Sequence, residues 1–247
     1  MQLLVSVRSA AEVAAALSGG ADIIDAKEPR HGSLGPVSAE VLSAILAQVP
    51  PDREVSIALG DVSRPDAVRT AIESLPVPTR RATTYVKLGF AGVTGGDLIA
   101  TLLESAVAAS LAHSPALRIV AVGYADATCA GSAAPDAVWR AAAVSGVAGV
   151  LLDTYGKSGG NLLTWLDPDA LFALIAGARE NGLMTAVAGG LREKDLGMVI
   201  AAGPDIIGFR GAACVGGRGG RVSRNRVRRL GESLRTVHSG SVQELVP

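Results

Sequence analysis

The amino-acid sequence predicts a single-domain (β/α)8 barrel, or TIM barrel, and three observations favour this fold. Short apolar runs rich in β-branched residues alternate with alanine-rich stretches of helical periodicity. Eight predicted strands and eight predicted helices alternate strictly, with no internal linker. The strands read as continuous apolar runs, which is typical of parallel strands buried on both faces. A doubly wound open sheet is the alternative fold, but no G-x-G-x-x-G follows the first strand.

Each predicted strand is a short, mostly aliphatic run with few charged residues. In chain order the strands occupy 3–7 (LLVSV), 22–26 (DIIDA), 54–60 (EVSIALG), 85–90 (YVKLGF), 118–124 (RIVAVGY), 149–155 (GVLLDTY), 184–189 (MTAVAG) and 205–211 (DIIGFRG). Most of these runs lead into glycine, proline or polar residues, which are typical of loops.

Several predicted helices have recognisable first and last residues. In chain order the helices occupy 9–18, 38–49, 65–76, 96–113, 135–145, 167–181, 192–202 and 224–237. Ser9, Ser38 and Asp167 are suitable N-caps, and Pro168 suits the first helical position. Glycines suited to ending a helix stand at Gly19, Gly146, Gly182 and Gly203. We assign 1–238 to the barrel and expect 239–247 to form a flexible tail.

The composition argues against several classes of partner. The chain has 23 basic and 23 acidic residues, so its net charge gives no reason to expect a nucleic acid or a membrane surface as partner. No apolar run reaches the roughly 20 residues of a membrane span, and the first residues do not resemble a signal peptide. Cys129 and Cys214 are far apart, which fits a reducing cytoplasm. No residue cluster has metal-ligand spacing, so we expect no metal or other cofactor. The alanine-rich helices are compatible with a homo-oligomer.

The few lysines stand at informative positions. Of the 23 basic residues only four are lysine: Lys27, Lys87, Lys157 and Lys194. The first three lie on or just after the predicted strands at 22–26, 85–90 and 149–155, whereas Lys194 lies in a predicted helix. Active sites of (β/α)8 barrels are built at the C-terminal ends of the strands, and alternate strands contribute to one interior layer. We therefore expect three lysines to converge at the barrel mouth.

Two carboxylates accompany these lysines. Asp25 precedes Lys27 by two residues, and Asp153 precedes Lys157 by four, so each carboxylate has the parity of its lysine. Internal salt bridges without a catalytic role are one interpretation, because buried charges persist when they are paired. Three lysines and two carboxylates at one barrel mouth favour catalysis instead. Clustered cations lower each other's pKa, which gives the neutral amine needed for Schiff-base chemistry.

The last two predicted strands are followed by glycine-rich loops. Gly189 and Gly190 end the strand at 184–189, and Arg210, Gly211 and Ala212 follow the last strand. Loops at these places often bind phosphate through backbone N–H groups and a helix N-terminus. Ordinary glycine turns would explain either loop alone, but the two together favour a phosphate site and a phosphosugar substrate.

Other candidate residues carry weaker signals. His31 lies near the expected site, where proton transfer and a solvated loop position are both reasonable interpretations. Tyr124 and Asp126 end the strand at 118–124 and suit either substrate contact or packing and capping. The segment RVSRNRVRR at 221–229 opens the last helix, and we expect it to form a solvated arginine face rather than an RNA-binding site.

These motifs together resemble one enzyme family. GGADIIDAKEPRHGSLG, YVKLGF, VAVGYAD, LLDTYGKSGGNL and GFRGAAC occur in the order found in (5-formylfuran-3-yl)methyl phosphate synthase, and the resemblance extends from residue 3 to about residue 236. It implies a barrel that condenses two molecules of glyceraldehyde 3-phosphate into a furan aldehyde phosphate. That product is the furan precursor of methanofuran or methylofuran, the C1 carriers of methanogens and some methylotrophic bacteria.

The resemblance also implies roles for individual residues. Lys27 would form the Schiff base, Lys87 would accept protons, and Asp25, Asp153 and Lys157 would complete the site. Gly156 departs from the family motif before Lys157, which leaves the reach of that lysine open. A class I aldolase or phosphosugar isomerase remains an alternative on the same barrel, as does a phosphosugar-binding barrel without catalysis.

Overall fold

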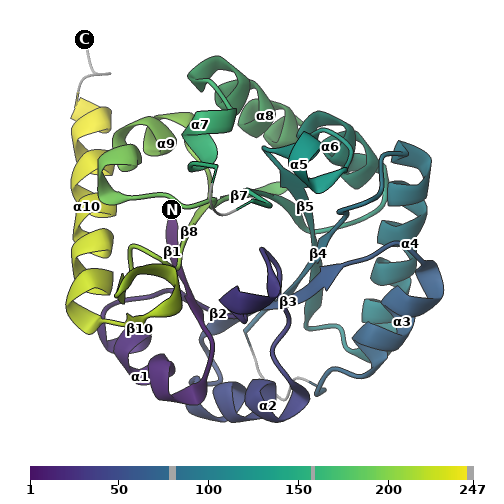
Figure 1. Cartoon of the computed structure of the whole chain (residues 1–247), viewed down its shortest axis with the longest axis horizontal. Helices are drawn as coiled ribbons and strands as arrows, with labels where there is room; N and C mark the ends of the chain where they lie inside the picture. The colour runs from purple at the N-terminus through teal and green to yellow at the C-terminus, as the bar shows by residue number, and fades with distance from the viewer. Residues whose placement is uncertain (78–81, 157–158, 244–247) are drawn as a thin grey trace.

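The strands form one closed parallel barrel in chain order, which confirms the predicted fold class. The computed structural model describes residues 1–77, 82–156 and 159–243. The barrel strands are β1 (Gln2–Val7), β2 (Ile23–Ala26), β3 (Glu54–Asp61), β4 (Thr84–Gly89), β5 (Leu117–Tyr124), β6 (Gly149–Asp153), β7 (Met184–Val187) and β8 (Ile206–Phe209). β8 pairs with β1, with Gln2 opposite Ile206, and this pairing closes the barrel (Figure 1).

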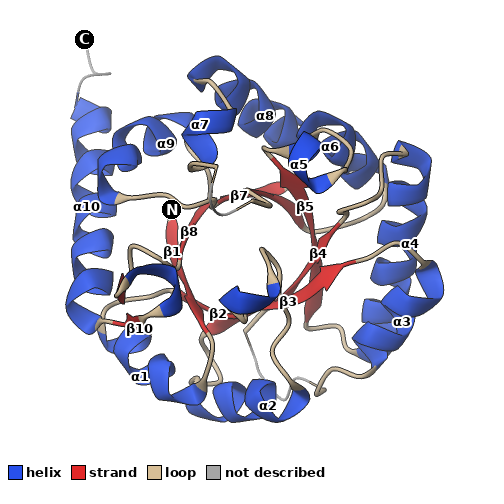
Figure 2. Ribbon diagram, viewed as in Figure 1, coloured by secondary structure: helices blue, strands red, loops and turns tan. Residues whose placement is uncertain are grey.

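A ring of helices surrounds the barrel (Figure 2). The main helices are α1 (Ala10–Ser18), α2 (Ala39–Gln48), α3 (Pro65–Glu73), α4 (Gly96–His113), α6 (Pro135–Val144), α8 (Pro168–Glu180), α9 (Leu196–Ala202) and α10 (Arg224–Gln243). The hydroxyl of Ser38 accepts a hydrogen bond from the Val41 amide, and the carboxylate of Asp167 accepts one from the Ala170 amide, as predicted for N-caps. Ser9 occupies the N-cap position of α1, but its side chain makes no capping hydrogen bond.

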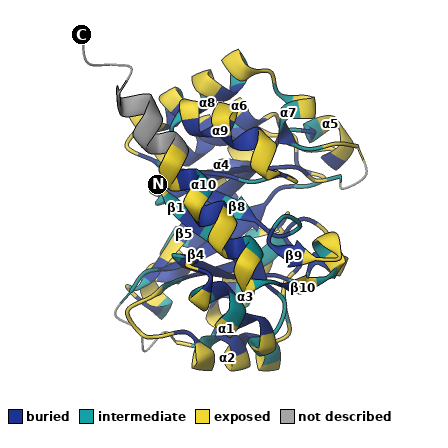
Figure 3. Ribbon diagram, turned by 90° about the vertical axis from the view of Figure 1, so that its left-hand side faces the viewer, coloured by how far each residue is buried: buried dark blue, intermediate teal, exposed yellow. Residues whose placement is uncertain are grey.

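The apolar core has two parts, separated by the barrel wall. The larger part lies between the outer face of the strands and the helices, and it includes Val5, Ile24 and Val86. The smaller part lies inside the barrel and includes Ile23, Val120 and residues of β6 to β8. Figure 3 shows the buried strands at the centre and the exposed outer faces of the helices. Burial on both faces explains why the strands lack the alternating pattern of a half-exposed sheet.

Several small elements at the loops were not predicted. They are η1 (Pro29–His31), α5 (Ala127–Ala130), α7 (Leu162–Trp165), η2 (Glu193–Asp195) and an excursion after β8 that contains β9 (Cys214–Val215), η3 (Gly217–Gly219) and β10 (Arg221–Val222). β9 and β10 pair antiparallel to each other. The predicted strands at 149–155, 184–189 and 205–211 are each shorter in the structure because their last residues belong to these loops.

The last helix is longer than predicted. α10 continues to Gln243, beyond its predicted end at 237, and residues 244–247 lie outside the described part of the chain. Within that described part, no helix combines the length and the apolar character needed to cross a bilayer.

Candidate active site

β2, β4 and β6 bring four charged side chains into the barrel mouth. Asp25 lies on β2, Lys27 is the first residue after it, Lys87 lies on β4 and Asp153 ends β6. All four are buried, with at most 7% of the residue exposed, and all line a cavity of about 570 Å³. The predicted convergence of these four residues is therefore present in the structure.

The deeper pair joins Lys87 to Asp25. Nζ of Lys87 lies 2.6 Å from Oδ1 of Asp25, and the hydroxyl of Ser6 donates a hydrogen bond of 2.7 Å to Oδ2. Burial alone would raise the pKa of Asp25, but the charges of Lys87 and Lys27 and these hydrogen bonds hold it below its ordinary value of 3.8. Asp25 is thus a carboxylate in the folded protein, and it fixes the position of the Lys87 amine.

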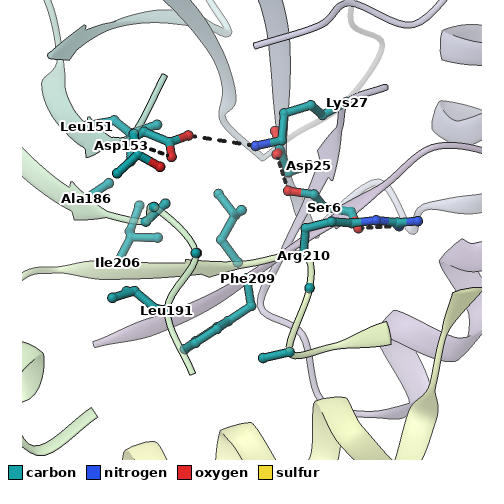
Figure 4. A pocket seen from close by; sticks show the side chains of 18 of the residues that line it. Ser6, Asp25, Lys27, Leu151, Asp153, Ala186, Leu191, Ile206, Phe209 and Arg210 are labelled. Atoms are coloured by element: carbon teal, nitrogen blue, oxygen red, sulfur yellow. Dashed lines mark hydrogen bonds and ion pairs between the residues drawn. The ribbon is translucent and has the colours of Figure 1, made fainter. Parts of the chain in front are cut away.

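The outer pair joins Lys27 to Asp153. Figure 4 shows Lys27 reaching from β2 across the pocket toward Asp153, and Nζ lies 3.9 Å from Oδ2. The hydroxyl of Ser33 lies 3.1 Å from the same oxygen and 2.7 Å from the carbonyl oxygen of Thr154. The other oxygen of Asp153 accepts a hydrogen bond from the Thr154 amide. Asp153 is therefore held in place independently of Lys27.

The loop after β6 is anchored by Asp126. Its two carboxylate oxygens accept hydrogen bonds from the amides of Tyr155 at 2.6 Å and Gly156 at 2.7 Å. Asp126 therefore acts as a loop anchor, one of the two roles considered for it. Lys157, which directly follows this anchored segment, lies outside the described residues.

The two glycine-rich loops line the same cavity. Gly189 and Gly190 have φ angles of +97° and +69°, which only glycine adopts readily. Among the described residues, none accepts a hydrogen bond from the amides of Gly190, Gly211 or Ala212. Backbone N–H groups from both loops thus remain available at the mouth, which is the arrangement required of a phosphate site.

The side chain of Arg210 contacts other residues of the protein. Its guanidinium donates to Glu12 twice, at 2.5 and 3.1 Å, and also to the carbonyl oxygens of Ser6, Gly220 and Arg218. These contacts use all five N–H groups of an arginine side chain. Figure 4 shows the side chain directed away from the centre of the pocket. The guanidinium therefore joins the β8 loop to α1 and β1, and the role of Arg210 in phosphate binding stays a prediction.

Glu12 is the buried partner that the sequence analysis missed. Burial raises the pKa of Glu12, but the hydrogen bonds from Arg210 and the Arg8 amide outweigh it and leave the pKa below its ordinary value of 4.5. A charged carboxylate thus meets a charged guanidinium next to the loop that follows β8. Their separation of 198 residues leaves no local signal in the sequence.

Arg218 is a second residue that the sequence analysis missed. It lies on η3, lines the cavity and donates to the carbonyl oxygens of Pro29 and Gly32. The excursion after β8 is thereby joined to the loop after β2, which carries Lys27. The sequence GGRGG around Arg218 is the only local signal of a loop shaped for this contact.

The weaker candidates fall outside the centre of the site. His31 is exposed on η1 and is not among the residues that line the cavity. The hydroxyl of Tyr124 donates to Asp61 at 2.7 Å, and its ring meets that of Tyr155 edge to face. Tyr124 is therefore a packing residue of the barrel mouth. In the predicted arginine face, Arg226 and Arg229 are among the residues that line the cavity.

The described residues include no group of three or more His, Cys, Asp or Glu side chains placed to hold a metal ion. The polar groups that line the cavity include two amines, their carboxylates, several arginine side chains, a few hydroxyls and backbone amides. This set suits proton transfer, imine formation and anion binding.

Comparison with known proteins identifies the family. A family model described as 4-HFC-P synthase matches residues 3–231. The chain is 38% identical over 237 residues to (5-formylfuran-3-yl)methyl phosphate synthase of Methanothermobacter thermautotrophicus, covering 95% of this chain and 99% of the relative. It is 34% identical over 235 residues to the Methanocaldococcus jannaschii protein of the same name, covering 94% and 99%.

Solved structures share the fold at low sequence identity. 3-Hexulose-6-phosphate synthase from Salmonella typhimurium superposes with a TM-score of 0.63 at 17% identity, covering 96% of this chain and 100% of that one. Phosphoribosyl anthranilate isomerase from Thermus thermophilus gives a TM-score of 0.60 at 16% identity, with the same coverage. These likenesses support the barrel fold alone. The match over nearly the whole chain confirms the resemblance seen in the motifs, and the chain belongs to the 4-HFC-P synthase family.

Proposed function

We propose that this chain is a (5-formylfuran-3-yl)methyl phosphate synthase that condenses two molecules of glyceraldehyde 3-phosphate, with loss of phosphate and water, through a Schiff base on Lys27. The observation that carries the proposal is a single cavity lined by two buried lysine–aspartate pairs and by two loops whose Gly190, Gly211 and Ala212 amides have no partner among the described residues. Membership of the family supports the same reaction.

Lys27 is the nucleophile in this mechanism. Its amine lies at the C-terminal mouth of the barrel and forms an ion pair with Asp153, whose Oδ2 is 3.9 Å away. Asp153 would take its proton once the two groups approach to hydrogen-bond distance, about 2.6–3.2 Å, in the substrate complex. The amine nitrogen bonds to the carbonyl carbon, and the carbonyl oxygen leaves as water. The resulting iminium withdraws electrons and acidifies the neighbouring carbon.

Lys87 would take the proton from that carbon as a neutral amine, after passing its own proton to Asp25, whose Oδ1 lies 2.6 Å from Nζ. Asp25 holds its Nζ at 2.6 Å, so the amine has a fixed position below Lys27. Removal of the proton gives an enamine, and the enamine electron pair expels phosphate from the adjacent carbon. Lys87 and Asp153 are then placed to return protons during the aldol addition of the second triose and the dehydrations that form the ring.

The loops after β7 and β8 would hold the phosphate that remains in the product. Their amides at Gly190, Gly211 and Ala212 can donate to phosphate oxygens, while Arg210 supports the second loop from behind. A cavity of about 570 Å³ falls within the range of about 300–1,000 Å³ typical of ligand pockets and leaves room for more than one triose. The furan product would serve as the precursor of methanofuran or a methylofuran.

The test follows furan and phosphate formation from glyceraldehyde 3-phosphate, by absorbance of the furan aldehyde and by phosphate release. Wild-type protein should form both. Lys27→Arg keeps the charge but cannot form an iminium, and it should abolish both products. Lys194 is exposed on η2, so Lys194→Arg is the matched control and should retain wild-type turnover. Turnover of a triose without furan would instead indicate an aldolase or isomerase.

A further inference from the structure

Arg218 connects the loop after β2 to the loop after β8. Its backbone carbonyl oxygen accepts a hydrogen bond of 3.1 Å from Nε of Arg210, and a Cβ added at Gly211 would lie 3.7 Å from its amide nitrogen. At the other end of the residue, the guanidinium donates to the carbonyl oxygens of Pro29 and Gly32. These contacts hold the side chain at a fixed place in the wall of the cavity.

Three of the five N–H groups of this guanidinium have a partner. Nε and Nη2 share the carbonyl oxygen of Pro29 at 3.3 and 3.1 Å, and Nη2 also donates to Gly32 at 2.6 Å. The two N–H groups of Nη1 have no acceptor among the described residues. Arg218 is half-buried, and Nη1 is not one of the fully buried polar atoms without a partner in the described chain, so it keeps accessible surface. A fixed guanidinium with two unused donors suits an anionic ligand such as phosphate.

The contacts of Arg218 place its guanidinium close to the pair formed by Lys27 and Asp153. Gly32, which accepts from Nη2, is followed directly by Ser33, whose hydroxyl lies 3.1 Å from Oδ2 of Asp153. Successive Cα atoms are only about 3.8 Å apart, so these two contacts are one residue of backbone from each other. Burial lowers the pKa of Arg218 below its ordinary value of 12.5, and the negative charge of Asp153 opposes this shift. The cation therefore lies near the ion pair that Asp153 forms with Lys27.

The proposed reaction requires a second anion site near Lys27. Two molecules of glyceraldehyde 3-phosphate bring two phosphate groups, and the loops after β7 and β8 are assigned to the one that remains in the product. The other leaves from a position two carbons along from the carbon bonded to Lys27. The C–O bond to this phosphate breaks, its electron pair stays on the phosphate oxygen, and the enamine nitrogen becomes an iminium again. Negative charge thus grows on an oxygen close to Lys27, where a fixed cation would lower the barrier.

We infer that Arg218 is a catalytic residue that binds the departing phosphate through Nη1 and stabilises the charge that develops as the C–O bond breaks. The inference rests on the proposed function, because that function supplies the leaving group. Arg210 has no N–H group left for this role. Arg226 and Arg229 also line the cavity, from α10, whereas Arg218 is joined by hydrogen bonds to the loop that carries Lys27.

The test compares Arg218→Met with the wild type at three steps of the reaction. Each protein is incubated with glyceraldehyde 3-phosphate, and phosphate release above the rate without protein is followed together with furan absorbance. Adducts on Lys27 are trapped with borohydride and mapped by mass spectrometry. Loss of one donor to a developing negative charge slows a reaction by about 100- to 1,000-fold, so phosphate release by Arg218→Met should be at least about 100-fold slower. The Lys27 adduct should still form, and its mass should show that the phosphate is retained.

The matched control is Arg221→Met. Arg221 lies on β10 in the same excursion, is exposed and is not among the residues that line the cavity. This variant should keep the wild-type rates of adduct formation and phosphate release. Urea unfolding checks that each variant folds. If Arg218→Met does not fold, Arg218→Gln gives the same comparison, because its amide can still donate to a loop carbonyl oxygen.

Two results would overturn the inference. Phosphate release at the wild-type rate would show that Arg218 does not act on the leaving group. Loss of the Lys27 adduct to the same extent as phosphate release would show that Arg218 only positions the loop after β2. A wild-type protein that forms neither adduct nor furan would instead refute the proposed function.

Discussion

Replacement of Arg210 by methionine distinguishes a supporting role for this residue from a phosphate-binding one. Arg210→Met leaves Glu12 buried without its charged partner and leaves the carbonyl oxygens of Ser6 and Gly220 without their donor. The side chains of Arg210 and Glu12 are each only 5% exposed, so water cannot readily replace the lost contacts. Breaking a buried ion pair from one side costs about 3–5 kcal/mol. We expect the free energy of unfolding to fall by that amount.

Urea unfolding measures this change, and a double variant tests its cause. Glu12→Met combined with Arg210→Met removes both charges, and it should recover about 2 kcal/mol or more relative to Arg210→Met alone, because no buried charge is then unpaired. The control is Arg140→Met, since the Arg140 side chain is 71% exposed and its ion pair with Asp136 contributes at most about 1 kcal/mol. Arg210→Met with wild-type stability and a raised KM would refute the supporting role and restore Arg210 as a phosphate ligand.

Three further predictions concern charge and loop geometry. The pKa values of Asp25 and Glu12 lie below their ordinary values of 3.8 and 4.5, so the folded state binds these protons less tightly than the unfolded chain. The urea midpoint should therefore stay constant between about pH 7 and 5 and decrease below about pH 4. A midpoint that rises on acidification would contradict this prediction. Asp126→Ala removes the acceptor of two loop amides, and it should lower the free energy of unfolding by about 2–3 kcal/mol and reduce kcat. The control Asp136→Ala, at an exposed position, should change neither quantity. Equal kcat values for the two variants would refute the role of Asp126 as a loop anchor. Gly189→Ala places a Cβ 3.2 Å from the Thr154 amide nitrogen at a φ of +97°. We therefore expect about 1–2 kcal/mol of destabilisation and a raised KM in steady-state assays. An unchanged KM would argue against phosphate binding by this loop.

The sequence predicts the barrel well because its signals are local and repeated. Strand runs and helical periods follow one another along the chain, and caps such as Ser38 and Asp167 mark helix starts. Strand ends are less well predicted, because the glycines after β7 continue an apolar run but adopt conformations that end the strand. The small elements between strands and helices have too few residues to show a period.

In the candidate site, too, local signals predicted some residues, whereas contacts between distant parts of the sequence could not be predicted. The period of two along a strand, and the shared interior layer of alternate barrel strands, were enough to predict that Asp25, Lys27 and Lys87 lie close together. The contact of Arg210 with Glu12 could not be predicted, because Glu12 is distant in sequence and becomes a neighbour only when the barrel closes.

The most direct test of the central claim is to trap the Schiff base. The protein is incubated with glyceraldehyde 3-phosphate and borohydride, and the modified peptide is mapped by mass spectrometry. Our account predicts a reduced adduct on Lys27, absent from Lys27→Arg and unaffected by Lys194→Arg. An unmodified Lys27 in protein that is forming furan, or an adduct only on another lysine, would contradict it.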